Sequence, residues 1–427
     1  MFYSLISIPI SIAVRQFFRV ISLVGESPET VAPVIFAPNH PNQAVDPFLI
    51  GSIAGRPVHF LAKSGLFKNY LLSKFFRSLN MIPVYRASDN QDTSQNSASF
   101  QEAIKALINN NALCIFPEGT STEQRNLLPL KTGISRIAFE AAVETGWAVD
   151  IKIQPISITY LSPRIFQSSV TLTIDKPISI LDYRALYDED SKLAVKKLTE
   201  DLANKLNTIT VSVPNLLLQQ DIEHITYLFD DDIDLRSRMQ EISRISHQVL
   251  QKFPLETQLV QTKIKELYNE GYSLGYYGVG SESLIKTKHS VLSHFIVVFG
   301  SITHFVPYTL TRLATNFLVK DPHNLASVKI GLGIVIYSMW YVIIFTLLNV
   351  FFSIYSTFLM LLLVMLAGDY SNRTSEATNI FVKSVLSRII NFNKEPYYIR
   401  HEKFLSNRES LKNKLLELSE IIRHDLH

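Results

Sequence analysis

One uncharged apolar run near the C-terminus limits the folds that this chain can adopt. No charged residue occurs between Lys329 and Asp369. A membrane-spanning helix needs about 20 predominantly apolar residues, so this run is long enough for two. One long helix buried in a soluble core is the alternative, but uncharged stretches of this length are rare outside bilayers. We therefore predict a membrane hairpin over residues 330–366, which could turn near Asn349.

A second apolar segment precedes the hairpin, over residues 290–310. It contains three residues that interrupt a simple span: His294, His304 and Pro307. It could span the membrane, re-enter it or lie at its surface, and we favour an interfacial or re-entrant segment. Three basic residues, which prefer the cytoplasmic side, follow it: Arg312, Lys320 and Lys329. The membrane segments are therefore placed within residues 287–368, with both ends of the hairpin cytoplasmic.

The N-terminal residues 1–24 are apolar but lack the basic residues that open a secretory signal. Their charges, Arg15 and Arg19, come late and lie four apart, on one face of a helix. We predict an amphipathic helix on the membrane surface, with the arginines toward the headgroups and Phe17 and Phe18 toward the acyl chains. A helix that covers the core of the following domain is the alternative.

Composition narrows the function classes that remain. The net charge is only +3 over 427 residues, so no bulk field favours a nucleic-acid partner. Cys114 is the single cysteine, which excludes an intramolecular disulfide and a cysteine-rich zinc site and suits a reducing compartment. Hydrophobic residues make up 47% of the chain, which is high for a soluble protein, and the apolar segments account for the excess.

Residues 25–180 alternate strand-like and helix-like runs. The expected strands cover residues 31–37, 57–63, 81–86, 112–120, 149–160 and 169–178. The expected helices cover residues 46–55, 99–111 and 133–146. Asp46 is expected to cap the first helix, with Pro47 as its first residue, and Ser99 is expected to cap the second. This alternation predicts an α/β fold, a layered domain whose mostly parallel central sheet is flanked by helices.

The remaining parts of the chain look mostly helical. Residues 181–286 contain amphipathic runs of mixed charge, which we interpret as a solvated helical accessory region. Residues 369–427 are interpreted as a helical tail on the cytoplasmic side.

Polar side chains that can take part in binding or catalysis follow three of the expected strands. Open α/β sheets form their sites at these carboxyl ends of the strands. The residues are His40 and Asp46 after the first strand, Arg86 after the third, and Glu118, Gly119, Thr120, Ser121 and the later Arg125 and Lys131 after the fourth. Each alone has an ordinary structural role, because loop histidines, helix caps, Glu-Gly turns and solvated bases are common. Their occurrence in order, each at the end of an apolar run, favours a site.

His40 and Asp46 could act as a general base and its orienting carboxylate. A neutral imidazole takes a proton from an alcohol, and a carboxylate on its other nitrogen stabilises the imidazolium that forms. No serine or cysteine stands out as a nucleophile, so the base would act directly on a bound hydroxyl. Arg86 and Lys131 could bind a phosphate on that acceptor, and backbone N–H groups after Glu118 could bind an anion. No metal site is expected, because no second ligand lies at a suitable spacing from His40.

Four motifs in this order resemble the membrane phospholipid/glycerol acyltransferase family (PlsC-like). The resemblance runs over roughly residues 33–160 and rests on "NHPNQAVDP", "MIPVYR", "FPEG" with the downstream "LLPLKTG", and "IQPISI". Two positions depart from the family pattern. Five residues rather than four separate His40 from Asp46, and Asn80 stands where the second motif usually opens with glycine. The longer spacing is similar to the fungal glycerol-3-phosphate/dihydroxyacetone-phosphate acyltransferase branch.

The resemblance implies transfer of an acyl group from acyl-CoA or acyl carrier protein (acyl-ACP) to the sn-1 hydroxyl of glycerol 3-phosphate or dihydroxyacetone phosphate. It implies His40 and Asp46 as catalytic residues, and acceptor binding by Arg86 and the turn from Glu118 to Lys131. It implies no cofactor or metal, and an integral membrane protein whose catalytic domain faces the cytoplasm. Acylation of 1-acylglycerol 3-phosphate or another lysophospholipid is the nearest alternative. A thioesterase and a non-catalytic lipid-binding protein are more distant ones.

Overall fold

The computed structural model describes residues 2–86, 91–92, 94, 96–213, 262–270, 291–390 and 403–411, with a few further single positions. The chain divides into two compact units. Unit 1 consists of Met1–Val14, Ile21–Thr159 and Val170–Ser212, and unit 2 of Arg15–Val20, Tyr160–Ser169 and Val213–His427.

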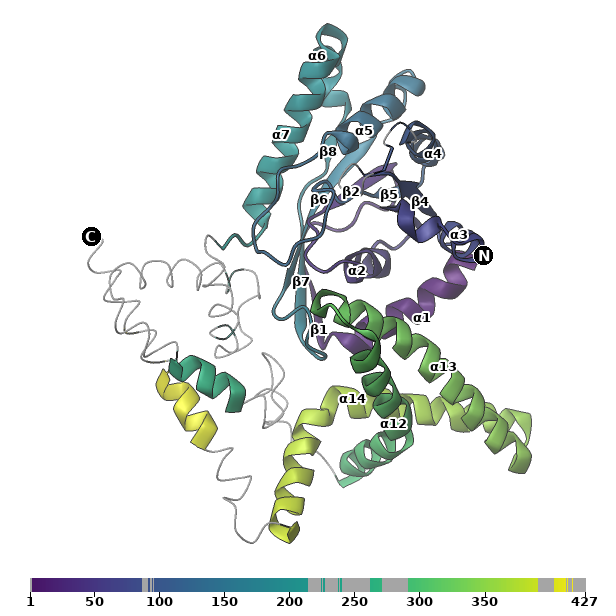
Figure 1. Cartoon of the computed structure of the whole chain (residues 1–427), viewed down its shortest axis with the longest axis vertical. Coiled ribbons are helices and arrows are strands. Elements are labelled where there is room, and N and C mark those ends of the chain that lie inside the picture. Colours follow the sequence, from purple (N-terminus) through teal and green to yellow (C-terminus); the bar gives the residue numbers. More distant parts are fainter. Residues whose placement is uncertain are drawn as a thin grey trace. The chain divides into compact units, whose positions relative to one another are not determined.

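An eight-stranded sheet forms the centre of unit 1 (Figure 1). Its order is β1-β7-β6-β2-β5-β3-β4, and β8 also pairs with β6. The strands are β1 (Val20–Gly25), β2 (Val34–Pro38), β3 (Val58–Lys63), β4 (Met81–Val84), β5 (Ala112–Cys114), β6 (Lys152–Tyr160), β7 (Ser169–Ile174) and β8 (Ile178–Ser179). Every pairing from β6 to β4 is parallel, and β8 is antiparallel to β6. The predicted α/β fold with a mostly parallel sheet is confirmed.

Helices cover both faces of this sheet, as parallel sheets require. The helices of unit 1 beyond the first are α2 (Val45–Ile53), α3 (Tyr70–Ser78), α4 (Asn96–Ile108), α5 (Gly133–Glu144), α6 (Arg184–Glu189) and α7 (Ser191–Ile209). Ile35 and Ala37 of β2 pack in one core with α4, α5 and α7. Val34 and Phe36, which alternate with them on β2, are equally buried on the other face. The strand that leads to the predicted site is therefore held from both sides.

The structure corrects the predicted boundary at residue 180. Leu198, Leu202 and Leu206 of α7 are fully buried and belong to the same core as α5. Their spacing of four residues is the apolar stripe of a helix that packs on a core, so the interpretation of α7 as a solvated accessory helix is wrong. Of the predicted accessory region beyond α7, residues 262–270 are helical, and most of the chain between 214 and 290 lies outside the described residues.

The predicted N-terminal helix over residues 1–24 is too long. Helix α1 (Phe2–Phe17) ends before β1, which joins the sheet beside β7. Phe17 and Phe18 are almost fully buried, and they contact the rings of Phe166 and Tyr160 respectively. Their predicted contact with acyl chains is wrong, because these rings pack against the end of β6 and the loop that follows it.

Helix starts also differ from the predictions. Helix α2 begins at Val45, and its cap position is Ala44, whose side chain makes no capping bond. Asp46 is therefore not the predicted cap, and Pro47 is the third helical residue rather than the first. Helix α4 begins at Asn96, three residues before the predicted cap Ser99. Asp46 does not cap the helix, because its carboxylate bonds to His40 and to the N–H of Asn42 instead.

Unit 2 contains α12 (Val291–Leu318), α13 (Leu325–Phe351) and α14 (Ile354–Ile390). Among the described residues, two helices are long and apolar enough to cross a membrane, Pro322–Phe351 and Ile354–Asn372. They meet at Phe352 rather than at the predicted Asn349. The rings of Phe345 and Phe358 lie 5.0 Å apart across this turn. Helix α12 is continuous through Pro307, so the segment 290–310 has no re-entrant turn. Of the predicted tail 369–427, residues 369–390 belong to α14 and residues 403–411 are also helical.

Helices α12 and α14 approach each other closely where both carry glycine. A Cβ atom on Gly300 would collide with the backbone of Ala367, and one on Gly368 would collide with the ring of His304. Ser301 and Ser371 share a hydrogen bond of 2.8 Å at the same crossing. Small residues allow such contact between helices in membranes.

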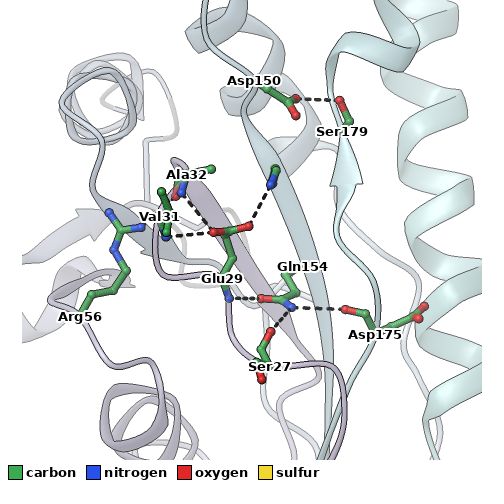
Figure 2. Close-up of polar contacts among 10 residues, drawn as sticks. Ser27, Glu29, Val31, Ala32, Arg56, Asp150, Gln154, Asp175 and Ser179 are labelled. Carbon is green, nitrogen blue, oxygen red and sulfur yellow. Dashed lines mark hydrogen bonds and ion pairs between the residues drawn. The ribbon is translucent and has the colours of Figure 1, made fainter.

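Glu29, in the loop that precedes β2, bonds to Gln154 of β6 (Figure 2). This link lies toward the amino ends of the two strands, whereas the predicted site lies at their carboxyl ends. The Glu29 carboxylate accepts bonds from the N–H groups of Val31 and Ala32 and from Lys152 Nζ, at 2.9, 3.1 and 2.9 Å. Gln154 accepts from the Glu29 N–H and donates to the carbonyl of Ser27. The hydrogen bond from Lys152 is the main cause that lowers the pKa of Glu29 to about 2.

We predict that Glu29→Gln destabilises unit 1 in a pH-dependent way. Because the folded pKa lies below the unfolded value of 4.5, ionised Glu29 stabilises the fold above pH 4.5 and loses this effect as the pH falls toward 2. The variant should lose about 2 kcal/mol at pH 7 and almost nothing near pH 2. Urea titrations of the full chain, followed by Trp147 fluorescence in a Trp340→Phe background, measure the difference. The exposed Glu144→Gln serves as the control, and an equal loss at both pH values would contradict the prediction.

Candidate active site

His40 and Asp46 meet at the carboxyl end of β2. His40 lies two residues beyond the strand, and Asp46 is the second residue of α2. Their Nδ1 and Oδ2 atoms are 2.8 Å apart. The Asp46 side chain is fully buried, whereas that of His40 is 12% exposed. A buried carboxylate on Nδ1 favours the tautomer that carries the proton on this nitrogen, which leaves Nε2 as the basic atom.

The backbone of the turn holds the Asp46 carboxylate in place. The same oxygen, Oδ2, accepts a bond of 2.7 Å from the N–H of Asn42. Gln43, next along the turn, has a positive φ of 42°. The five residues between His40 and Asp46 therefore form a compact turn that closes around the carboxylate, and the longer spacing does not separate the pair.

Glu118 joins this turn to the loop that follows β5. Its Oε1 atom accepts from the N–H of His40 and its Oε2 atom from the N–H of Leu128, both at 3.0 Å. The residue is only 3% exposed. Burial raises the pKa of the Glu118 carboxyl, although these two bonds oppose the effect. Since both oxygens bond within the protein, the geometry gives Glu118 a positioning contact with His40.

Ser121 and Thr122 hold the His40 backbone from the same loop. The carbonyl of His40 accepts from Ser121 Oγ at 2.8 Å and from the N–H of Thr122 at 3.0 Å. Ser121 Oγ in turn accepts from the N–H of Gln43 at 3.0 Å. The sequence placed Ser121 in the polar turn after the fourth expected strand but gave it no separate role.

Phe116 and Asn39 complete the surroundings of His40. The rings of Phe116 and His40 stack with centroids 3.9 Å apart and planes inclined by 20°. The Asn39 side chain bonds to both backbone groups of Ile158 in β6, at 2.6 and 3.3 Å. The chain around His40 is therefore fastened to the neighbouring strand on each side, β5 and β6.

The rest of the Pro-Glu-Gly turn lies close to Lys131. Gly119 has a φ of +75°, which suits glycine, and a Cβ atom there would touch Lys131 Cγ at 3.4 Å. The N–H of Lys131 donates to the carbonyl of Pro117 at 2.7 Å. Lys131 and Thr120 are exposed. Lys131 thus shares one surface with the turn that carries Glu118.

Arg86 lies on the same edge of the sheet but farther from His40. It follows β4 by two residues and is half-buried. Three strand spacings separate β4 from β2, which amounts to about 14 Å. The structure therefore brings His40, Asp46 and Glu118 into direct contact and leaves Arg86 at the far end of the edge.

We predict that Ser121→Ala loosens the His40 turn without unfolding unit 1. The substitution removes one hydrogen bond and leaves the Gln43 N–H without this acceptor, so the free energy of unfolding should fall by about 1 kcal/mol. Hydrogen exchange of the amides of residues 39–43 in the full chain should accelerate. Ser52→Ala, which removes a bond inside α2, is the matched control. Unchanged exchange in the turn would contradict the positioning contact.

Comparisons with known proteins place these residues in one matched region. Residues 21–159 match the family model described as Acyltransferase. Glycerol-3-phosphate O-acyltransferase 2 of Saccharomyces cerevisiae is 24% identical over 231 residues, which are 52% of this chain and 31% of that protein. Glycerol-3-phosphate O-acyltransferase 1 of the same yeast is 33% identical over 119 residues, which are 27% and 16%.

A third relative carries a different substrate in its name. The 1-acyl-sn-glycerol-3-phosphate acyltransferase of Cocos nucifera is 29% identical over 143 residues, which are 30% of this chain and 45% of that protein. The chain spans less than a third of the length of the two yeast relatives. The contact between His40 and Asp46 lies within the region that the family model matches. Residues 21–159 are a domain of the acyltransferase family.

Proposed function

We propose that this protein transfers an acyl group from acyl-CoA or acyl-ACP to the sn-1 hydroxyl of glycerol 3-phosphate or dihydroxyacetone phosphate. The 2.8 Å contact between His40 and the buried Asp46 carries the proposal, because it forms a base whose proton-accepting atom is fixed. The names of the two yeast relatives support glycerol 3-phosphate as the acceptor.

The proposed reaction proceeds without a covalent enzyme intermediate. His40 Nε2 takes the proton of the acceptor hydroxyl while the oxygen attacks the thioester carbonyl. The new C–O bond forms, the C–S bond breaks, and the departing thiolate takes the proton back from the imidazolium. The Asp46 carboxylate stabilises that imidazolium. This scheme uses no metal or cofactor.

Acceptor binding is proposed for the turn from Glu118 to Thr120, for Lys131 and for Arg86. The contact of the Lys131 stem with Gly119 supports Lys131 as a charge beside this turn. A basic side chain and the turn's backbone N–H groups are suitable partners for a phosphate. Arg86, at about 14 Å along the edge, would contact the phosphate end of a substrate rather than the reacting hydroxyl. Glu118 would act chiefly by positioning His40.

Membrane attachment is proposed through α13 and α14. Their length and apolar composition suit a bilayer, and the basic residues before them favour a cytoplasmic side for the acyltransferase domain. The partners would then be the bilayer, which receives the acylated product, and the acyl donor. No nucleic acid is expected as a partner.

Acylation of 1-acylglycerol 3-phosphate, or of another lysophospholipid, is the second candidate. The name of the Cocos nucifera relative favours it. The same pair of residues would perform the same chemistry on a hydroxyl whose neighbour is already acylated.

We predict that His40→Ala and Asp46→Asn both abolish most acyl transfer. Without the imidazole no base remains, and with asparagine the Nδ1 proton loses its anionic partner, so kcat should fall by about three to four orders of magnitude. KM for the acceptor should change little, since neither group is proposed to bind it. Steady-state kinetics on the purified full chain measure both. The exposed Asp182→Asn is the control, and full activity in His40→Ala would refute the mechanism.

We further predict a preference for the smaller acceptors. Purified protein is offered labelled acyl-CoA or acyl-ACP with glycerol 3-phosphate, dihydroxyacetone phosphate or 1-acylglycerol 3-phosphate. Acylation of glycerol 3-phosphate or dihydroxyacetone phosphate with the higher kcat/KM is expected. A higher value for 1-acylglycerol 3-phosphate would replace the first candidate by the second.

A further inference from the structure

Helix α3 connects two parallel strands but contributes nothing to the core. It lies between β3 and β4 in the chain and contacts β4 (Figure 1). A crossover helix of this kind ordinarily buries an apolar face on the sheet. Helix α3 buries none of its nine residues. Four of its five large apolar side chains, those of Tyr70, Leu71, Leu72 and Phe75, are instead exposed.

The exposed apolar side chains of α3 form one surface, called the α3 surface here. Leu71, Leu72 and Phe75 are spaced so that they share one face of the helix, and they are 73%, 50% and 42% exposed. Tyr70 adjoins them with 78% exposure, and Leu66 precedes the helix with 42%. Five large apolar side chains are thus exposed within ten residues. Such a cluster indicates an interaction site, whereas single exposed apolar residues are normal on a protein surface.

Contacts at its start and on its other side fix α3 as a formed helix beside α4. Asn69 caps it by accepting from the N–H groups of Leu71 and Leu72, at 2.9 and 3.2 Å. The rings of Phe67 and Phe76 lie 5.9 Å apart, and Arg77 pairs with Glu102 of α4 at 3.3 Å. The helix is therefore anchored by one side, and the open face is a formed part of the fold.

The basic character of the chain segment that contains α3 indicates the kind of partner that the α3 surface binds. No aspartate or glutamate occurs between Asp46 and Asp89, whereas six basic residues do: Arg56, Lys63, Lys68, Lys74, Arg77 and Arg86. Lys68 and Lys74 flank the apolar side chains and are exposed. An amphipathic helix with apolar and aromatic residues on one face and lysines beside them matches a bilayer that contains anionic lipids.

We infer that the α3 surface docks on an anionic lipid bilayer. Leu71, Leu72 and Phe75 enter the boundary between headgroups and acyl chains, and Lys68 and Lys74 contact the lipid phosphates. The membrane attachment proposed above for α13 and α14 would raise the local concentration of this surface at the bilayer. The docking concerns unit 1 alone and does not depend on which acceptor the enzyme uses.

The test follows the surroundings of residue 71 in the full chain, reconstituted in vesicles. Cys114 is the single cysteine and is fully buried, so a fluorophore attached to Leu71→Cys reports one position. Vesicles contain either phosphatidylcholine alone or phosphatidylcholine with phosphatidylglycerol, each with a spin label on the acyl chains. We expect strong quenching at residue 71, greater in the anionic vesicles. The matched control is Lys196→Cys on α7, where the side chain is 72% exposed, and it should not be quenched.

A charge variant tests whether the lysines beside the helix recognise anionic lipid. Lys68→Gln with Lys74→Gln should weaken docking in anionic vesicles by roughly fivefold per lysine and leave it unchanged in neutral ones. The control Lys192→Gln with Lys196→Gln, carrying the Leu71→Cys label, removes equal charge from α7 and should have no effect.

Three results would overturn the inference. These are equal quenching at residues 71 and 196, equal quenching in both kinds of vesicle, and a fluorescence change at residue 71 on adding acyl carrier protein in detergent without vesicles. The last result would assign the surface to a protein partner. Acyl transfer is measured independently in detergent, without vesicles. A failure of docking would therefore not contradict the proposed reaction.

Discussion

The buried carboxylate of Glu118 is the contact on which the arrangement of the site depends. It joins the loop after β2 to the loop after β5, and it does so through the backbone N–H of His40 itself. The join is possible because the two strands pair in parallel, with Phe36 opposite Cys114, so their carboxyl ends arrive together. The contact of His40 with Asp46 and its stacking on Phe116 then follow from the lengths of two short loops.

Much of this arrangement could be predicted from the sequence, because it depends on local pattern. Apolar runs bounded by turn residues located the parallel strands, and polar residues directly after a strand must lie at its carboxyl edge. The contact of His40 with Asp46, and the place of Glu118 next to them, required little more than that rule. The uncharged run before Asp369 located most of α13 and the first part of α14 by length alone.

What the sequence could not predict depends on partners far along the chain. Asn39 bonds to Ile158, 119 positions away, and no local pattern indicates that pairing. Asp46 looked like a helix cap because its neighbours suit one, but in the fold its carboxylate holds Asn42 and His40 instead. The apolar stripe of α7 was visible, yet only the core shows that Leu198 packs against α5 rather than covering a separate region.

The open face of α3 has a consequence for how such a domain can change over time. Most substitutions in a core cost stability, and the margin of a folded domain is only about 5–15 kcal/mol. Leu71, Leu72 and Phe75 lie outside the core, so replacing them costs the fold of unit 1 little. Substitutions on this face therefore leave the contacts that hold the His40 turn, including the one from Glu118, unchanged. The residues that would contact a new binding surface, on α3, are therefore different from those that hold His40 in place.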